Sequence, residues 1–387
     1  MEKLELLAPA KNYKTAISAI NSGADAVYIG ANFFGARKNA SNSIEEIEKV
    51  VNYAHLFNVK VYVTLNTILN DEELEKCEEL IKKLYEIKVD SIIIQDFGIL
   101  NLALENKLPP IALHASTQCD NRSTEKVKFL ENVGFKRAVL ARELPLNKIE
   151  EIRKNTSLEL ECFIHGALCV SYSGQCYLSE FIGNRSANKG ECAQACRKKY
   201  SLVDENNKII VKNQYLLSLK DNNLSNHLDK LIKAGVTSFK IEGRLKDENY
   251  VKNTVLFYHE LLKKYPRKGQ GIILKDFEPN LEKSFNRGFT DDYLFNKKDN
   301  IYNFLTPKST GEFLGEVVSS NSDCFVLKTS KDISPQDGLI MLTENNLVGF
   351  LVNKVEKVKS GIKVYPNKKF SSGSFLKPKT KIYRNLG

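Results

Sequence analysis

The 387-residue sequence lacks the short motifs that mark several large enzyme classes. It has no H-E-x-x-H, no G-x-S-x-G, no glycine-rich loop ending in a Walker lysine and no G-x-G-x-x-G. Zinc metalloproteases, serine hydrolases, P-loop nucleotidases and Rossmann dehydrogenases are therefore each without their usual signature. Any chemistry has to come from another arrangement of residues.

Long apolar runs are also missing from the sequence. None reaches the roughly 20 residues that a helix needs to cross a bilayer. The first residues, Met1–Leu7, turn acidic at once and do not form the apolar stretch of a secretory signal. We therefore expect a cytoplasmic protein that does not bind membranes. In that reducing compartment, clustered thiols are expected to be metal ligands and not disulfides.

Positive charge exceeds negative charge by 10 and is unevenly placed. From Ile301 to the end there are 13 Lys and Arg against 7 Asp and Glu, and from Lys359 onward there are 8 basic residues and no acidic one. Such a basic segment is either a solvated face or the electrostatic footprint of a nucleic acid. Charge alone leaves both interpretations open.

Short β-rich runs alternate with helical patterns over the first ~250 residues, which is the rhythm of βα units around a parallel sheet. Several runs are continuously apolar, as strands covered on both faces should be. Eight of them predict an α/β fold, a (β/α)₈ TIM-like barrel. Leu216–Leu219 is a ninth candidate, and a doubly wound open sheet is the alternative. The eight strand candidates are Leu4–Leu7, Ala26–Ile29, Val59–Leu65, Ser91–Gln95, Ile111–His114, Ala138–Ala141, Leu158–Ile164 and Phe239–Glu242.

The pattern changes after Tyr265. We expect a barrel over residues 1–265 with a cysteine-rich loop at 165–199, then a linker region at 266–306. Residues 307–387 contain short β-type runs separated by turn residues, which predicts a basic, C-terminal antiparallel β-domain in the form of a small barrel. These runs are Phe313–Val318, Phe325–Thr329, Leu339–Leu342, Val348–Val352 and Ile362–Tyr365.

Polar residues gather where the predicted barrel strands end. Functional side chains of such barrels lie at the carboxyl ends of the strands. Any one of these residues could simply cap the rim, but a set that converges beside several cysteines favours a functional site. Six members of the set are expected to bind substrate: Asp96, His114, Gln118, Arg142, Glu143 and Arg244. The other members are Glu161, His165 and Glu242.

Four cysteines lie in one loop: Cys169, Cys176, Cys192 and Cys196, separated by six, fifteen and three residues. Structural zinc usually takes two short Cys pairs, and only the last two cysteines form one. An iron–sulfur cluster tolerates more varied spacing. A cysteine peptidase would use one thiol with His165 as base, which leaves the other three thiols unexplained. Cys77, Cys162 and Cys324 are expected to be small buried hydrophobes. Cys119 is excluded less firmly as a ligand, because it lies just past the end of a predicted strand.

At this loop the sequence resembles a known family. The stretch Glu161–Ser179 (ECFIHGALC, four residues, GQCYLS) resembles the signature of the collagenase-like peptidase family U32. Supporting stretches extend over the predicted barrel and into the linker. They are LELLAPA (Leu4–Ala10), GADAVYIG (Gly23–Gly30), LHASTQ (Leu113–Gln118), LAREL (Leu140–Leu144), FKIEGR (Phe239–Arg244) and FNRGFT (Phe285–Thr290).

The resemblance extends to RNA- and quinone-hydroxylating members of that family, which carry a 4Fe–4S cluster and hydroxylate without molecular oxygen. One branch makes 5-hydroxyuridine at the tRNA wobble position with prephenate as hydroxyl donor, and another hydroxylates a cytidine of the large ribosomal RNA. The quinone proteins lack a C-terminal β-domain. The resemblance therefore implies the tRNA branch, with tRNA and a small hydroxyl donor as partners and a partner protein unknown. A collagenase-like peptidase is the alternative, and a zinc-stapled RNA-binding module without catalysis is a third possibility.

The resemblance also suggests roles for the polar set and for the cysteines. Cys169, Cys176, Cys192 and Cys196 are the implied cluster ligands, with zinc as the weaker alternative. We expect arginines to grip the dicarboxylate donor, carboxylates and a histidine to transfer protons, and aromatic side chains to stack on RNA bases. The arginines are Arg37, Arg142 and Arg244, the proton-transfer residues are Glu161, His165 and Glu242, and the aromatic residues are Tyr28, Phe33, Phe34 and Tyr172.

Overall fold

The computed structural model describes residues 2–32, 34–35, 41–269, 273–274, 277–342, 347–370 and 376–386. Contacts divide the chain into two compact units. Unit 1 comprises Met1–Ala195, Asp221–Pro279 and Thr290–Ile301, and unit 2 comprises Cys196–Lys220, Asn280–Phe289 and Tyr302–Gly387. The chain therefore enters unit 2 three times, first from within the predicted barrel segment and then from within the predicted linker.

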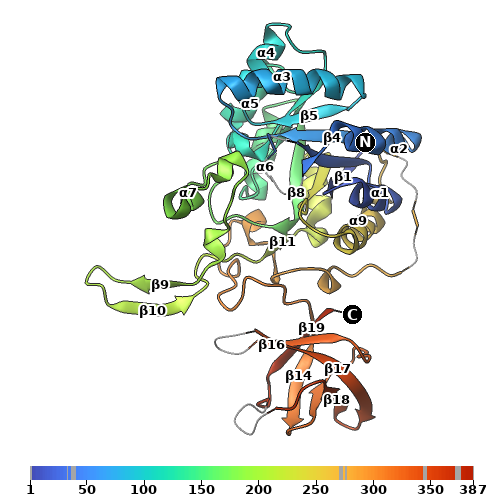
Figure 1. Cartoon of the computed structure of the whole chain (residues 1–387), viewed down its shortest axis with the longest axis vertical. Coiled ribbons are helices and arrows are strands. Elements are labelled where there is room, and N and C mark those ends of the chain that lie inside the picture. Colours follow the sequence, from blue (N-terminus) through green and yellow to red (C-terminus); the bar gives the residue numbers. More distant parts are fainter. Residues whose placement is uncertain are drawn as a thin grey trace. The chain divides into compact units, whose positions relative to one another are not determined.

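Unit 1 contains a closed barrel of eight parallel strands, with helices around its outside (Figure 1). Each strand pairs with the next along the chain, and β12 pairs with both β1 and β8, which closes the barrel. The predicted (β/α)₈ barrel is confirmed, and the open doubly wound sheet is wrong. The barrel strands are β1 (Glu5–Ala10), β2 (Ala26–Ala31), β4 (Lys60–Leu65), β5 (Ser91–Ile94), β6 (Ala112–Ala115), β7 (Arg137–Val139), β8 (Glu159–Ala167) and β12 (Ser238–Ile241).

Three short strands, β3, β11 and β13 (Phe289–Thr290), extend this sheet without entering the barrel, and β13 follows β11 in the sheet order. β3 (Ser41–Asn42) pairs with the end of β2, and β11 (Asp221–Asn223) runs antiparallel to the end of β8. The ninth candidate, Leu216–Leu219, is not a strand, because within it only Leu219 makes a β-bridge, and that bridge is isolated. A turn therefore occupies a run of leucines that sequence alone could not distinguish from a buried strand.

The helices begin where local side chains satisfy their first amide groups. Ser43 and Glu46 form the capping box expected from the sequence at the start of α2. Gly23, Gly134 and Gly235 follow helices with φ of 92°, 99° and 83°, the left-handed conformation that favours glycine. The α-helices are α1 (Tyr13–Asn21), α2 (Ile44–Leu56), α3 (Asp71–Glu86), α4 (Phe97–Leu104), α5 (Thr124–Asn132), α6 (Leu146–Lys154), α7 (Leu178–Gly183), α8 (Leu228–Lys233) and α9 (Glu248–Leu262).

Short 3₁₀ helices lie within the loops. They are η1 (Thr117–Cys119), η2 (Ala187–Lys189), η3 (Ala195–Arg197), η4 (Ser225–His227), η5 (Leu281–Lys283) and η6 (Asp292–Phe295). Among the described residues, no helix is long and apolar enough to cross a membrane.

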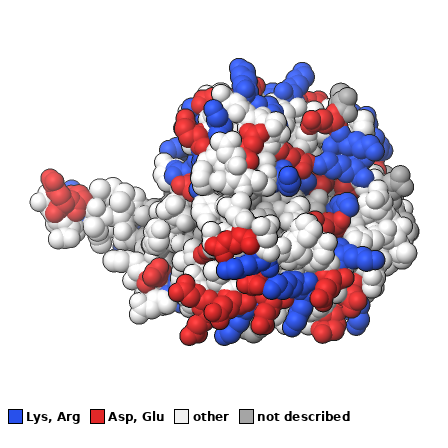
Figure 2. Space-filling model, turned by 90° about the horizontal axis from the view of Figure 1, so that it is seen from above, with Lys and Arg blue, Asp and Glu red and all other residues white. Residues whose placement is uncertain are grey.

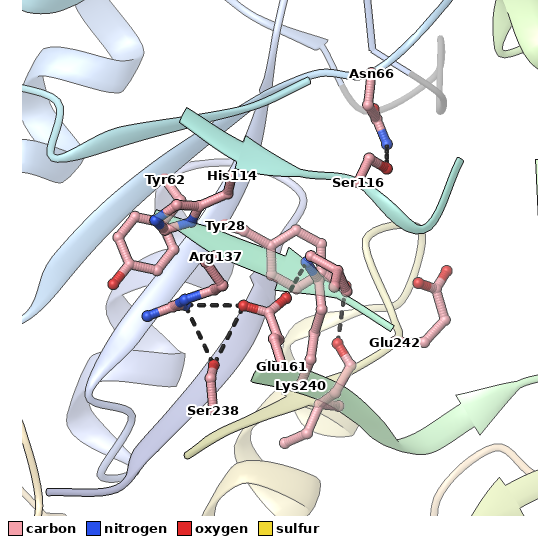
Figure 3. A network of polar contacts seen from close by, with 12 residues as sticks. Tyr28, Tyr62, Asn66, His114, Ser116, Arg137, Glu161, Ser238, Lys240 and Glu242 are labelled. Carbon is pink, nitrogen blue, oxygen red and sulfur yellow. Dashed lines mark hydrogen bonds and ion pairs between the residues drawn. The ribbon is translucent and has the colours of Figure 1, made fainter. Parts of the chain in front are cut away.

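The interior of the barrel contains a layer of charged side chains centred on Arg137. Strand register brings Glu5, Glu161 and Ser238 to one level. The Arg137 guanidinium donates to Glu5 Oε1 at 2.6 Å and to Glu161 Oε2 at 2.8 Å, and it is only 2% exposed. Lys240 Nζ donates to the other oxygen of Glu161 at 2.7 Å. Figure 3 shows the side chains of Arg137, Glu161, Ser238 and Lys240 turned toward one another.

The pairing with Arg137 decides the protonation of the buried Glu5 carboxylate. Burial by itself would raise the pKa of Glu5, but the Arg137 guanidinium outweighs burial and lowers that pKa to about 2. Tyr62 also donates to Glu5, at 2.7 Å. A buried charge such as the Glu5 carboxylate is tolerated only while its ion-pair and hydrogen-bond partners are present. The layer therefore fixes four strands to one another at the amino-terminal side of the barrel.

Removing Arg137 should be far more damaging than removing a surface cation. We expect Arg137→Met to lower the free energy of unfolding by about 3–5 kcal/mol, because it leaves the Glu5 carboxylate buried without its main partner. The matched control is Lys82→Met, which breaks an exposed i,i+4 pair with Glu78 and should cost at most about 0.5 kcal/mol. Urea unfolding measures both values. Equal losses in the two variants would contradict a stabilising charged layer.

Unit 2 contains a second, antiparallel barrel, as the sequence predicted. Its strands follow the order β14-β15-β18-β17-β16-β19 around a closed barrel. Phe325, Phe350 and Phe370 pack edge to face in its core. The strands are β14 (Glu312–Ser320), β15 (Phe325–Lys328), β16 (Gly338–Leu342), β17 (Leu347–Val358), β18 (Gly361–Pro366) and β19 (Lys381–Leu386). Unit 2 also includes a two-stranded hairpin of β9 (Tyr200–Val203) and β10 (Ile209–Gln214).

The net positive charge of the chain comes from unit 2. The sequence of unit 2 has 21 Lys and Arg against 10 Asp and Glu, whereas that of unit 1 has 36 against 37. The face of the molecule in Figure 2 carries side chains of both signs next to one another. Unit 2 therefore has a net charge of +11 and unit 1 a net charge of −1, which makes unit 2 the part of the chain suited to a polyanion.

Candidate functional site

The candidate site lies at the carboxyl ends of the unit 1 strands, where the chain leaves β8. From there, residues 168–195 form a long excursion that includes α7, and we call this segment the cysteine loop. It is the part of the predicted cysteine-rich loop, residues 165–199, that lies beyond β8 in unit 1. Its contacts with the loops after β4, β6 and β7 determine the geometry of the site.

The middle of the cysteine loop is fastened to the loops that follow β6 and β7. Glu143 accepts two hydrogen bonds from Ser173, one from the backbone N–H and one from the hydroxyl, both at 2.8 Å. Gly174 has φ of 78°, and a Cβ there would lie 2.1 Å from the carbonyl oxygen of Gln118. Only glycine allows that approach. The segment between Cys169 and Cys176 is therefore held against two strand ends.

The far end of the cysteine loop reaches the opening between β4 and α3. The carbonyl of Asn188 accepts a hydrogen bond from the Ile68 amide at 3.4 Å. Lys189 forms an ion pair with Glu73 in the first turn of α3. The cysteine loop thus extends from β8 past the ends of β7 and β6 to the loop after β4, along one side of the barrel mouth.

Arg142 is the predicted site residue with the most suggestive surroundings. Its Nη2 lies 3.3 Å from Glu242 Oε2, its Nη1 lies 3.8 Å from Cys169 Sγ, and its guanidinium lies 4.1 Å from the centre of the Phe163 ring. Its Nε is buried and has no hydrogen-bond partner among the described residues. An unsatisfied buried donor on a stacked guanidinium is suited to an anionic ligand. The structure therefore brings Arg142, Glu242 and Cys169 together, as the sequence predicted for this end of the barrel.

Three other predicted site residues contact neighbouring loops and helix ends of the protein itself. Glu143 and Gln118 support the cysteine loop as described above. Asp96 caps α4 by accepting from the Gly98 amide at 2.7 Å and also accepts from the Leu69 amide at 2.8 Å. These contacts give Asp96, Glu143 and Gln118 positioning roles. Their substrate contacts stay a prediction.

The two predicted histidines are buried. Burial lowers the pKa of His165 to about 3, and its Nδ1 lies 3.3 Å from Tyr258 Oη. Burial, with the charge of Arg137, also holds the pKa of His114 well below its usual range, and His114 Nδ1 lies 3.2 Å from Ser91 Oγ. Both imidazoles are therefore neutral near pH 7. A proton acceptor with a pKa of about 3 is a weak base, so proton transfer through His165 has little physical support.

Glu161 and Arg244 point into the barrel. Glu161 belongs to the charged layer, where Arg137 and Lys240 neutralise it. Arg244 is buried, donates to the Thr64 hydroxyl, and lies 5.8 Å from the Tyr28 ring. Glu161 is therefore better placed for stability than for proton transfer. Arg37 and Phe33 lie outside the described residues.

None of the four candidate ligand cysteines is in a disulfide. Cys169 and Cys192 are exposed, and Cys176 and Cys196 are partly exposed. The Gln194 amide lies 3.4 Å from Cys192 Sγ, within donating distance of the sulfur. Cys196 is the first residue of unit 2. The remaining cysteines, Cys77, Cys119, Cys162 and Cys324, are buried as predicted.

The four thiols are not gathered into a cage. Across the described ranges, no group of three or more His, Cys, Asp or Glu side chains could hold a metal ion. A 4Fe–4S cluster needs four ligands around one centre. The placement of the side chains therefore shows no ready-made cluster site among the described residues, and no chemical step is derived through one. The ligand set stays a prediction.

Sequence reasoning missed Ser173, Gly174 and the charged layer. The signal for the first two was a Ser-Gly pair between two cysteines, where a tight turn is expected. The signal for the layer was a charge inside an otherwise apolar strand, as with Arg137 before Ala138 and Val139. Neither signal identifies a partner, because the partners come from strands far apart in the sequence.

Loosening the Glu143 anchor should free the cysteine loop without unfolding the barrel. We expect Glu143→Gln to make Cys169 and Cys176 react several-fold faster with a thiol reagent, because the amide replaces a charged acceptor of two hydrogen bonds. The matched control is Glu150→Gln on the exposed face of α6. Timed labelling followed by peptide mass spectrometry measures the rates. Identical rates in both variants and the parent would show that Glu143 does not position the loop.

Comparison with known families shows which family this chain belongs to. The model of Peptidase family U32 matches residues 11–303, so the chain belongs to this family. The family assignment that the sequence motifs suggested is confirmed.

Three relatives indicate the range of proteins similar to this chain. A 23S rRNA 5-hydroxycytidine synthase of Escherichia coli K12 is 46% identical over 99% of this chain, which spans only 59% of that protein's length. A protein of Methanocaldococcus jannaschii named as an uncharacterized protease is 38% identical over 79% of this chain and 76% of its own length. The tRNA hydroxylation protein P1 of Bacillus subtilis is 34% identical over 83% of this chain and 79% of its own length.

Proposed function

We propose that this chain is an RNA hydroxylase that adds oxygen to C5 of a pyrimidine. The observation that carries the proposal is the similarity to two RNA-hydroxylating relatives, one of them 46% identical over 99% of the chain. The charge distribution supports it, because the net charge of +11 in unit 2 provides attraction for RNA phosphates. The Arg142 group provides an anion-binding element at the mouth of the unit 1 barrel.

Two RNA targets are in competition. The sequence motifs predicted 5-hydroxyuridine at the tRNA wobble position. A ribosomal cytidine is the second candidate, because identity to the rRNA enzyme (46%) exceeds identity to the tRNA protein (34%). The covered lengths point the other way, since the chain spans 59% of the rRNA enzyme but 79% of the tRNA protein. Both targets demand that a base leave its stack and enter a pocket.

Deletion of the gene should remove one hydroxylated pyrimidine nucleoside. Nucleoside mass spectrometry of separated tRNA and 23S rRNA measures the loss, and re-expression of the chain should restore it. Loss from tRNA supports the wobble-uridine target, and loss from 23S rRNA supports the cytidine target. If both RNA pools are unchanged, RNA hydroxylation is ruled out. Gelatin cleavage by the purified chain would then favour the collagenase-like peptidase, an alternative that the protease name of one relative supports.

We also propose that a 4Fe–4S cluster assists this reaction without molecular oxygen, with prephenate as the hydroxyl donor. The support is four cysteines outside any disulfide in one stretch of chain, with the Arg142 guanidinium beside Cys169 and the Gln194 amide beside Cys192. Donors near sulfur stabilise thiolates and tune iron–sulfur clusters. Binding would require the loop to draw its sulfurs together. Zinc at the same thiols is the weaker alternative.

Substitution of the loop cysteines should abolish metal binding. We expect the chain purified without air to contain about four irons, and Cys176→Ser to lose most of that iron. The matched control is Cys324→Ser, which changes a buried cysteine of the unit 2 barrel and should keep the iron. Elemental analysis measures iron and zinc together. Zinc in place of iron would support the zinc-stapled module, and no metal at all would contradict both metal proposals.

A further inference from the structure

We infer that Tyr177 and Phe181, at the start of and within α7, form a stacking platform for unpaired RNA bases. The inference rests on the proposed RNA hydroxylase function and deepens it by locating an RNA contact. Tyr177 is 58% exposed and Phe181 is 91% exposed. The Phe181 amide donates to the Tyr177 carbonyl at 2.9 Å, so the two residues are one helical turn apart and lie on the same face.

Phe181 is more exposed than any other large apolar side chain that the structure describes. On α2, for comparison, Ile47, Val50 and Val51 are buried, and the last residue, Leu56, is 76% exposed. Phe181 lies almost wholly in water, next to Ile182, which is 46% exposed. A contiguous exposed apolar patch of this kind marks a binding surface, because leaving it in water forgoes the stabilisation of burial.

The chemistry beside the patch favours nucleic acid. Arg185, which follows the left-handed Asn184 at the end of α7, is exposed, and its Nε donates to the Glu191 carbonyl at 3.1 Å. Tyr172, in the same loop, is covered by the guanidinium of Arg122 from outside the loop, with the Cζ 3.9 Å from the ring centre. Aromatic rings interspersed with guanidinium planes are the surface on which single-stranded RNA bases stack. The charge of unit 2 complements the same polyanion.

The platform is attached to the candidate site. Tyr177 directly follows Cys176. The loop before it is anchored by Glu143, and the segment after it by the Asn188 and Ile68 contact. A base stacked on α7 would thus be held by a segment whose position is set by the ends of the barrel strands.

Removing the rings should weaken binding of single-stranded RNA without changing its salt dependence. We expect Tyr177→Ala and Phe181→Ala each to raise the Kd for a 12-nucleotide single-stranded pyrimidine RNA about tenfold. The slope of log Kd against log salt should be unchanged, because no phosphate contact is lost. Phe181→Trp keeps an aromatic ring at this position and should bind the RNA with the Kd of the parent chain. The matched control is Tyr85→Ala, which removes a ring that is 43% exposed near the end of α3.

The outcomes separate this inference from the proposed function. If the parent chain binds no RNA, the RNA function itself fails. If the parent binds and the alanine variants bind equally well, the platform is overturned while the function stands. Sedimentation of the same proteins completes the test: a dimer of the parent that dissociates in Phe181→Ala would show that α7 covers a second copy of the chain, which also overturns the inference.

Discussion

The ion pairs of Arg137 inside the barrel are the interaction on which the candidate site depends. They join β1, β7 and β8, while Lys240 of β12 adds its own pair to the shared carboxylate of Glu161. Buried charges stabilise a structure only when every partner is in place, so the layer penalises any slip in strand register. The register in turn sets where each strand ends, and hence where Arg142, Glu242 and the cysteine loop meet.

Much of the fold could be predicted, because it is encoded locally. Continuous apolar runs marked the strands, and glycines and a capping box marked the helix ends, so the barrel and its C-terminal companion followed from pattern alone. The Leu216–Leu219 error shows the limit, since a leucine-rich turn and a buried strand have the same composition. The sequence also could not show that residues 196–220 belong to unit 2. No local pattern indicates which of two hydrophobic cores a segment packs against.

The site was predictable as a set but not in its roles. Position at strand ends correctly brought Arg142 and Glu242 together with Cys169. It could not show that Glu161 is neutralised inside the barrel, that Asp96 caps α4, or that His165 is too deeply buried to hold a proton near neutral pH. Those roles depend on partners from distant strands. Likewise, cysteine spacing permits a shared metal centre but does not define the loop conformation that would bring four sulfurs together.

The division of labour between the units links structure to function. Unit 1 has an anchored loop, exposed aromatic rings and an arginine with an unsatisfied donor. Unit 2 carries the net positive charge that, in the proposed function, attracts RNA. The most direct measurement is transfer of oxygen by the purified chain, without air, to RNA isolated from the deletion strain in the presence of a dicarboxylate donor. The account predicts that one pyrimidine nucleoside gains the mass of a single oxygen atom. Unmodified RNA together with cleaved gelatin under the same conditions would contradict it.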